Sequence, residues 1–273
     1  MNLFKKNSHV TLLNLNLFNV AQRKQAHLAG LFAICVFLDE KKQLNGKNMG
    51  SVSALQRRFP GIATDDAKRV LHLCESRYDS IQKLTQRFSS LNSMDAEALL
   101  EVFKELHIGL FPHPKTNALI LAARGTASRK DIQQNVMTAL GAKGEKYQSL
   151  QQLVPLLKKH QIYADIYTGT SLGGGIVMAL ANMLDATEAV VITFDAQRLN
   201  RRQYHFSQSH QNVQAVPCID YRIASVLSLG AIMSNPLFKQ VKTLAIPKHA
   251  DTYNPLKQLK INHSPGEITR YLK

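Results

Sequence analysis

The residues with the clearest chemical potential are one serine and the glycines around it. An apolar stretch beginning at Ile166 leads straight into Gly169-Thr-Ser171-Leu-Gly173, and small residues follow from Gly174. Where a strand turns abruptly into a helix, the residue at the turn is strained and has backbone close to its side chain. Gly169 and Gly173 remove the Cβ atoms that would collide there. We therefore predict a sharp strand-to-helix turn that presents the Ser171 hydroxyl at the edge of a sheet.

A hydroxyl placed in this way is suited to nucleophilic attack. The following helix points its first N–H groups toward the same place, and the N–H of Leu172 would stabilise negative charge on an attacked carbonyl. A lone serine is a poor nucleophile, so a histidine base and a carboxylate that orients it are also required. Two other interpretations stay open. The glycines would serve only tight helix packing, or they would form a phosphate-binding loop, although Gly175 stands where that loop needs lysine.

The elements that must position this serine lie in the second part of the chain. Short β-rich runs occur at residues 117–123, 162–168, 189–194 and 241–246, with a helical pattern at 147–160 between the first two. Residues 107–111 would close a hairpin with the first of these strands. Strands that alternate with helices are typical of a mostly parallel sheet. We therefore predict an α/β fold with helices on both faces of the sheet.

The first hundred residues have a different pattern. Apolar residues recur there at helical spacing, and Ser93 provides a capping residue for a helix that continues to about Leu106. We predict a helical N-terminal region at residues 1–106 that packs on a core at 107–273, and we expect one continuous body in place of two independent domains.

Several motifs after residue 107 resemble the class 3 lipases and related α/β-hydrolases. Residues 169–174 (GTSLGG) are similar to the family's G-H-S-L-G-G, with Thr170 in place of the histidine. Residues 119–126 (LILAARGT) match an apolar strand that ends in R-G-S/T, and residues 191–200 are similar to T-F-G-S-P-R-x-G-N without its glycine and proline. The resemblance implies an α/β-hydrolase-like core and a serine esterase or lipase activity.

The resemblance also implies the rest of the catalytic machinery. In this family the order along the chain is serine, acid, histidine. Asp251 lies in a segment similar to the one that carries the family's aspartate, and His263 follows in the tail. We expect Ser171, Asp251 and His263 to form the triad, with Asp195 as the alternative acid because it follows the next strand. Thr126 matches the position of the second oxyanion donor, beside Leu172.

Acyl transfer by such a triad needs no cofactor and no metal. Cys35, Cys74 and Cys218 are too few and too far apart in sequence for a disulfide framework or a metal site, so we interpret them as buried apolar residues. The implied substrate is a lipid or another carboxylic ester.

The chain is strongly basic. With 34 Lys and Arg against 19 Asp and Glu, its net charge is +15, which would favour peripheral contact with an anionic membrane. No nucleic-acid-binding motif accompanies the charge.

The apolar run at residues 26–38 is shorter than the about 20 residues of a membrane-spanning helix, and it does not have the form of a signal peptide. We therefore expect no transmembrane segment, and either a cytoplasmic location or export that needs no signal peptide. The competing function is a catalytically inactive hydrolase-like module that binds membranes or a protein partner.

Overall fold

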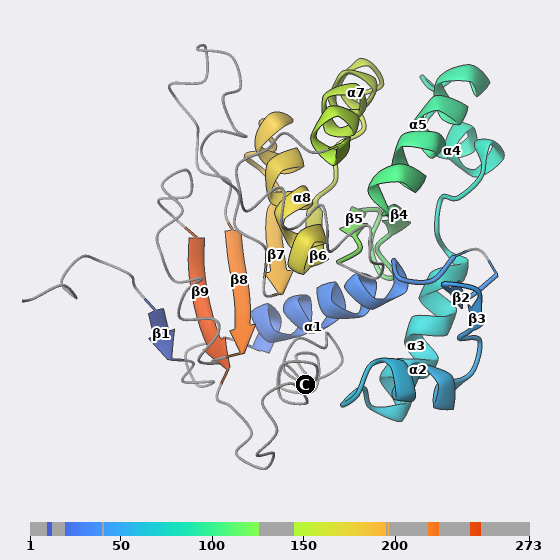
Figure 1. Ribbon diagram of the computed structural model, residues 1–273. Helices are drawn as coiled ribbons and strands as arrows, with labels where there is room; N and C mark the ends of the chain where they lie inside the picture. Colours follow the sequence, from blue (N-terminus) through green and yellow to red (C-terminus); the bar gives the residue numbers. More distant parts are fainter. Residues whose placement is uncertain are drawn as a thin grey trace, which may run out of the picture.

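The computed structural model describes residues 10–12, 20–39, 41–125, 145–194, 196, 218–223 and 241–246. Within these ranges a seven-stranded sheet has the order β1-β9-β8-β7-β6-β5-β4 (Figure 1). Its strands are β1 (Val10–Leu12), β4 (Ile108–Pro112), β5 (Leu119–Ala123), β6 (Ile166–Thr170), β7 (Val190–Phe194), β8 (Cys218–Ile223) and β9 (Val241–Ile246). Strands β2 (Gln43–Leu44) and β3 (Lys47–Asn48) form a separate small hairpin.

Across the sheet, the neighbouring strands β1, β9, β8, β7, β6 and β5 are all parallel, and β4 joins β5 as an antiparallel hairpin. β6 is a central strand of the sheet, next to β7, with Ile166 opposite Ile120 of β5 and Val190 of β7. Every residue of β5 and β6 is buried. Helices cover both faces of a parallel sheet, so the side chains on both faces of these strands are buried. This explains why the residues of β5 and β6 are almost all apolar or small.

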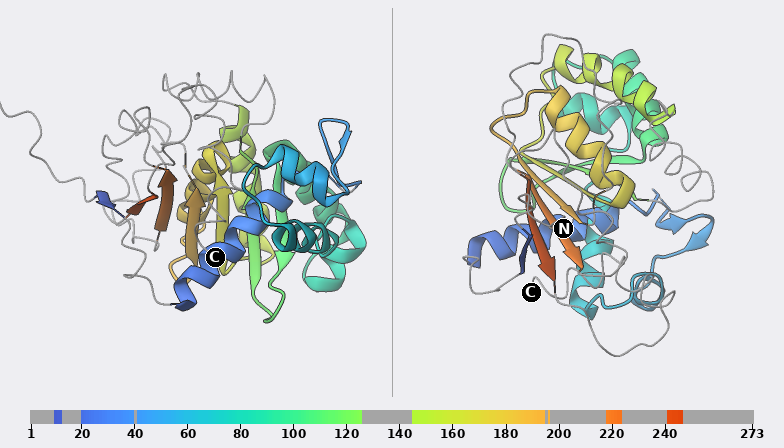
Figure 2. Two further views of the ribbon diagram at one scale, coloured as in Figure 1. Left: turned by 90° about the horizontal axis from the view of Figure 1, so that it is seen from below. Right: turned by 60° about the vertical axis from the view of Figure 1, so that its left-hand side comes forward.

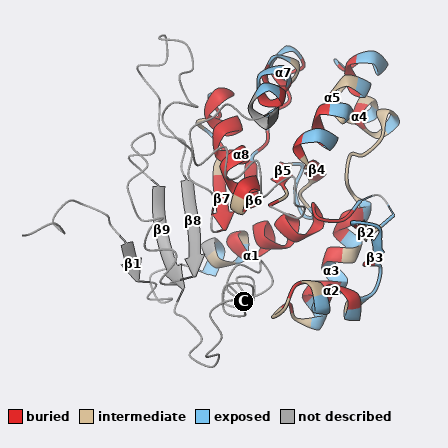
Figure 3. Cartoon of the chain, viewed as in Figure 1, coloured by how far each residue is buried: buried red, intermediate tan, exposed pale blue. Residues whose placement is uncertain are grey.

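One face of the sheet is covered by helices that follow or precede its strands. They are α4 (Ile81–Arg87), α5 (Ser93–Leu106), α7 (Glu145–Lys159) and α8 (Ser171–Met183). Their apolar side chains form one core with Leu119, Leu121 and Tyr167 of the sheet. Figure 3 shows that α8 is buried along nearly its whole length, as expected for a helix whose residues after Ser171 are all small or apolar except Asn182.

The opposite face is covered by helices from the start of the chain, α1 (Val20–Cys35), α2 (Val52–Arg58) and α3 (Thr64–Glu75). These helices form a second core with Phe111, Ile120 and Ala122. Side chains alternate between the two faces along a strand, so β5 contributes its odd-numbered residues to one core and its even-numbered residues to the other. Figure 2 shows α1 and α8 on opposite sides of the sheet.

Helix α1 also makes a polar contact with the central strand. The Thr168 hydroxyl of β6 donates a hydrogen bond to the carbonyl oxygen of Ala29 at 3.2 Å, and both residues are buried. A buried hydroxyl needs such a partner, so this bond fixes α1 against the strand that leads to Ser171.

The predicted fold class is confirmed: the sheet is mostly parallel, α/β-hydrolase-like, covered on both faces and preceded by a helical region.

The prediction that Ser93 caps α5 is wrong. Asn92 is the N-cap, and its side chain accepts a hydrogen bond from the N–H of Asp95 at 2.8 Å. Asparagine caps as well as serine does, so the sequence alone does not distinguish two adjacent candidates. The division after residue 106 stays a prediction. In the described ranges, no helix is both long enough and apolar enough to cross a bilayer.

Candidate active site at the end of strand β6

The central strand turns into a helix without an intervening loop. β6 ends at Thr170 and α8 begins at Ser171, which has a φ of +49°. A positive φ is uncommon for any residue other than glycine and costs about 1–3 kcal/mol, so the surrounding structure must hold it. The side chain of Ser171 is half-buried, whereas residues 172–183 of α8 are buried.

Two glycines provide the space for this turn. A Cβ atom on Gly169 would lie 2.7 Å from the carbonyl carbon and oxygen of Gly173. A Cβ atom on Gly173 would overlap the carbonyl oxygen of Ala123, at the end of β5. Both obstacles are backbone atoms, which cannot rotate away as a side chain would. The first turn of α8 therefore packs directly on the ends of two strands, and only glycine fits at these positions.

The segments after β5 and β7 also reach the start of α8. A Cβ atom on Gly125 would lie 2.7 Å from the Thr170 hydroxyl oxygen, and one on Gly174 would lie 2.8 Å from the Cβ atom of Ala196. The carboxyl ends of three parallel strands thus meet around Ser171. In open α/β sheets this edge is where ligands bind.

The start of α8 has an electrostatic character that suits a developing anion. Its N-cap residue, Thr170, makes no side-chain capping hydrogen bond to the first N–H groups. These groups carry the positive end of the helix dipole, and the N–H of Leu172 is among them. Leu172 itself is 5% exposed, so this donor lies where water competes weakly.

The structure describes only part of the predicted site. Ser171, Leu172, Gly169 and Gly173 lie together at the turn. The remaining predicted residues lie outside the described residues, and their roles stay predictions; they are Thr126, Asp195, Asp251 and His263.

The described strands show where the segments that lead to three of these residues, Thr126, Asp195 and Asp251, start. Thr126 directly follows Gly125, and Asp195 directly follows the last residue of β7. Asp251 follows β9, which ends at Ile246 and is parallel to β6 through β8 and β7. Parallel strands end at the same edge of a sheet, so β5, β7 and β9 all deliver their following segments to the edge at which Ser171 lies.

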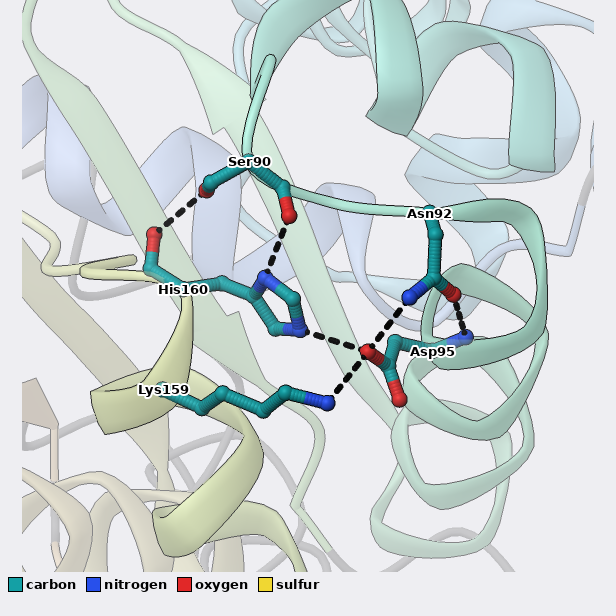
Figure 4. Close-up of polar contacts among 5 residues, drawn as sticks. All are labelled: Ser90, Asn92, Asp95, Lys159 and His160. Atoms are coloured by element: carbon teal, nitrogen blue, oxygen red, sulfur yellow. Dashed lines mark hydrogen bonds and ion pairs between the residues drawn. The ribbon is translucent and has the colours of Figure 1, made fainter.

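A histidine and an aspartate that sequence inspection did not single out form a buried pair elsewhere (Figure 4). The Nε2 atom of His160 lies 2.9 Å from Oδ2 of Asp95, and its Nδ1 atom lies 2.8 Å from the carbonyl oxygen of Ser90. His160 follows α7 and precedes β6, whereas Ser171 follows β6. The pair therefore lies at the opposite end of the strand, about 15 Å away along five residues, and cannot serve Ser171.

Asp95 is instead the centre of a structural network between α5 and the end of α7. Besides His160, its carboxylate accepts hydrogen bonds from Lys159 at 2.7 Å and from the Asn92 side-chain amide at 3.0 Å. The hydrogen bond from Lys159, with a further one from His160, lowers the pKa of Asp95 below its ordinary value against the opposing effect of burial. The network has no sequence motif, because its members come from segments more than 60 residues apart.

An open cavity of about 720 Å³ lies where β4 begins and β5 ends. Its lining includes His107, Gly109 and Arg124, together with Val36 and Arg77 from the helical region. Arg124 also lies against the start of α8, since a Cβ atom on Gly173 would approach its carbonyl carbon. The cavity is thus adjacent to the edge that carries Ser171. Among the described residues, no three His, Cys, Asp or Glu side chains are grouped as metal ligands.

The chain was compared with models of known protein families. The family model described as "Phospholipase-like: Tle-like phospholipase domain" matches residues 73–225, more than half of the chain. The matched region includes β4 to β7, α7 and α8, and therefore the turn at Ser171. No curated protein sequence matches the chain.

Proposed function

The chain belongs to the family of Tle-like phospholipase domains, and from this premise we propose that it is a carboxylic ester hydrolase of lipids with Ser171 as its nucleophile. The family supports lipid esters as the substrate class. The similarity of residues 169–174 to the class 3 lipase motif supports a serine mechanism.

The observation that carries the proposal is the conformation of Ser171. Its φ of +49° costs folding free energy, and its position between the last residue of a central strand and a buried helix makes the strain unavoidable. A packing role alone would be served by any small residue at a relaxed turn. The turn places Ser171 at the start of α8, whose first N–H groups receive no side-chain cap from Thr170, and this supports a site where a nucleophile and an oxyanion donor act together.

In the proposed mechanism the Ser171 hydroxyl attacks the ester carbonyl while His263 takes its proton. Asp251 holds the imidazole in the required orientation, with Asp195 as the alternative acid. The N–H groups of Leu172 and Thr126 stabilise the oxyanion. The alcohol leaves with the proton from His263. A water molecule, deprotonated by His263, then attacks the acyl group, and the Ser171 oxygen leaves with that proton.

The test removes the nucleophile and keeps the fold. We expect Ser171→Ala to reduce hydrolysis of a short-chain nitrophenyl ester and of a phospholipid at least about 10³-fold, since a triad acts as a unit. A fluorophosphonate probe should label the native chain on Ser171, as mapped by mass spectrometry, and should not label the variant. Far-UV circular dichroism and the thermal unfolding midpoint check that the variant is folded.

Ser53→Ala is the matched control, because Ser53 is an exposed serine on α2. This variant should retain full turnover and labelling. Undiminished hydrolysis by folded Ser171→Ala would disprove the assignment of the nucleophile. A folded native chain that neither reacts with the probe nor hydrolyses either ester would favour an inactive, binding-only module.

A further inference from the structure

Two cysteines that are far apart in the sequence lie together between α1 and α3. Cys35 is the last residue of α1, and Cys74 lies in the last turn of α3, 39 residues later. The thiol of Cys74 lies 3.8 Å from the carbonyl oxygen of Cys35. The thiol of Cys35 lies 3.5 Å from the carbonyl oxygen of Val70, one turn before Cys74. Each sulfur therefore faces the helix that carries the other.

The surroundings make the two thiols unequal. A hydrogen bond from the Cys35 side chain lowers the pKa of Cys74, and the positive charges of Arg77 and Lys42 lower it further. Burial raises the pKa of Cys35 well above its ordinary value. Cys74 is 9% exposed and Cys35 is fully buried. Cys74 is thus the thiol that ionises first and meets an oxidant first, with Cys35 directly behind it.

We propose that Cys35 and Cys74 are a reversible redox site that closes to a disulfide and joins α1 to α3. In the first step the Cys74 thiolate attacks a disulfide oxidant such as oxidised glutathione, forming a mixed disulfide and expelling one glutathione thiolate. The sulfur of Cys35 then attacks the sulfur of Cys74 and displaces the second glutathione, whose sulfur takes up the proton that Cys35 loses. Two protein thiols are oxidised, and one glutathione disulfide is reduced to two thiols.

The position of this pair gives the link a structural consequence. Arg77 donates a hydrogen bond to the Cys35 carbonyl oxygen at 2.7 Å and stacks 5.1 Å from the centre of the Phe111 ring on β4. α1 in turn is bonded to β6 through Thr168. A disulfide would therefore tie α3 to the helix that lies across the central strand. The inference does not depend on the proposed hydrolytic function.

The experiment uses the full chain incubated with reduced or oxidised glutathione. After denaturation, free thiols are blocked with N-ethylmaleimide, and the digested chain is mapped by mass spectrometry. We expect a linked peptide pair containing Cys35 and Cys74 only after oxidation, reversed by dithiothreitol. The oxidised chain should have a thermal unfolding midpoint about 5–10 °C higher, because the link restricts the unfolded state.

Three variants make the result specific. Cys218→Ala changes the third cysteine and should keep both the linked peptide and the midpoint shift. Cys35→Ala and Cys74→Ala should each lose both, and each tolerates the change in volume because buried cysteine behaves as a small apolar residue. A native chain that retains both free thiols, stops at a glutathione adduct, or links either cysteine to Cys218 would overturn the proposal. If a variant does not fold, the linked peptides mapped in the native and Cys218→Ala chains still show whether Cys35 and Cys74 form the disulfide.

Discussion

At the scale of single residues, the strained serine and its glycines form one packing unit. Ser171 adopts a positive φ, and the backbone of Gly173 lies against the carbonyl of Ala123. Strain of this kind persists only where neighbouring atoms leave no alternative. The same close packing that leaves no room for a Cβ atom on Gly173 also holds the Ser171 hydroxyl at the sheet edge.

We therefore expect Gly173→Ala to damage both stability and turnover. The added Cβ atom would overlap the Ala123 carbonyl oxygen, and backbone must move to relieve it, so the free energy of unfolding should fall by about 2–3 kcal/mol. Urea unfolding followed by circular dichroism measures the change. Gly50→Ala is the control, because its Cβ atom would meet only the Asn48 side-chain oxygen, at 3.0 Å, and should change stability by no more than about 0.5 kcal/mol. Equal losses in the two variants would contradict this account.

These residues were accessible from the sequence because a short local pattern determines them. Glycines on either side of a serine after an apolar run already specify the turn. The Asp95–His160 pair was not accessible, because its partners are brought together by the packing of α5 against the end of α7 and carry no local pattern. The predicted burial of Cys35 and Cys74 is confirmed, but their proximity could not be predicted for the same reason.

At the scale of elements, the carboxylate of Asp95 links two helices that the chain separates. It lies in the first turn of α5 and binds Lys159 and His160 at the end of α7. Its position near the amino end of α5 also places a negative charge where the helix dipole favours one. The link thus stabilises the packing of the helical layer on the core only while Asp95 is ionised.

Asp95→Asn should therefore lower stability in a pH-dependent way. The folded pKa of Asp95 is depressed, so its contribution is present above the unfolded pKa of about 4 and is lost as the pH falls through the lower folded pKa. We expect the variant to unfold at lower urea than the native chain at pH 7, with a difference that shrinks below about pH 4. Glu97→Gln, at an exposed position on the same helix, should show no such convergence. A difference between Asp95→Asn and the native chain that stays constant with pH would contradict the role of the charge.

The element order was largely predictable, and its gaps have a physical cause. The hairpin of β4 with β5 and the strands β6, β7 and β9 were expected because apolar runs and helical periodicity mark them. β1 has only three residues, too few to show a pattern. β8 was missed because Asp220 and Arg222 interrupt its apolar residues; its alternation is a strand signal, but the sequence interpretation followed continuous apolar runs. The strands were predicted to begin earlier than they do at β5 and β6. Before β6, Ile162 and Ala164 are buried although they precede the strand, which explains the early start predicted there. Before β5, residues 117 and 118 are not buried, and burial does not explain the difference.

At the scale of the whole molecule, charge is the property that acts at long range. The net charge of +15 predicts that the chain binds anionic membranes, with about 1 kcal/mol for each basic residue that lies near the surface. This contribution falls as salt shortens the Debye length.

We expect the Ser171→Ala chain to sediment with vesicles of phosphatidylglycerol and phosphatidylcholine at about 20 mM salt, and to be released at about 500 mM. The substitution prevents hydrolysis of the vesicles during the measurement. Vesicles of phosphatidylcholine alone should bind several-fold less. Binding that is equal on both vesicles and unaffected by salt would show that electrostatic attraction is not what brings the chain to lipid.

The outermost strand of the sheet has a consequence for biosynthesis. β1 is paired only with β9, so that Val10 is aligned with Thr243. A ribosome makes β1 before every other described strand and β9 after them, and among the described strands only β9 pairs with β1. β1 must therefore remain without its sheet partner until residues 241–246 have been synthesised, so this border of the sheet forms only after all the other described strands have been made.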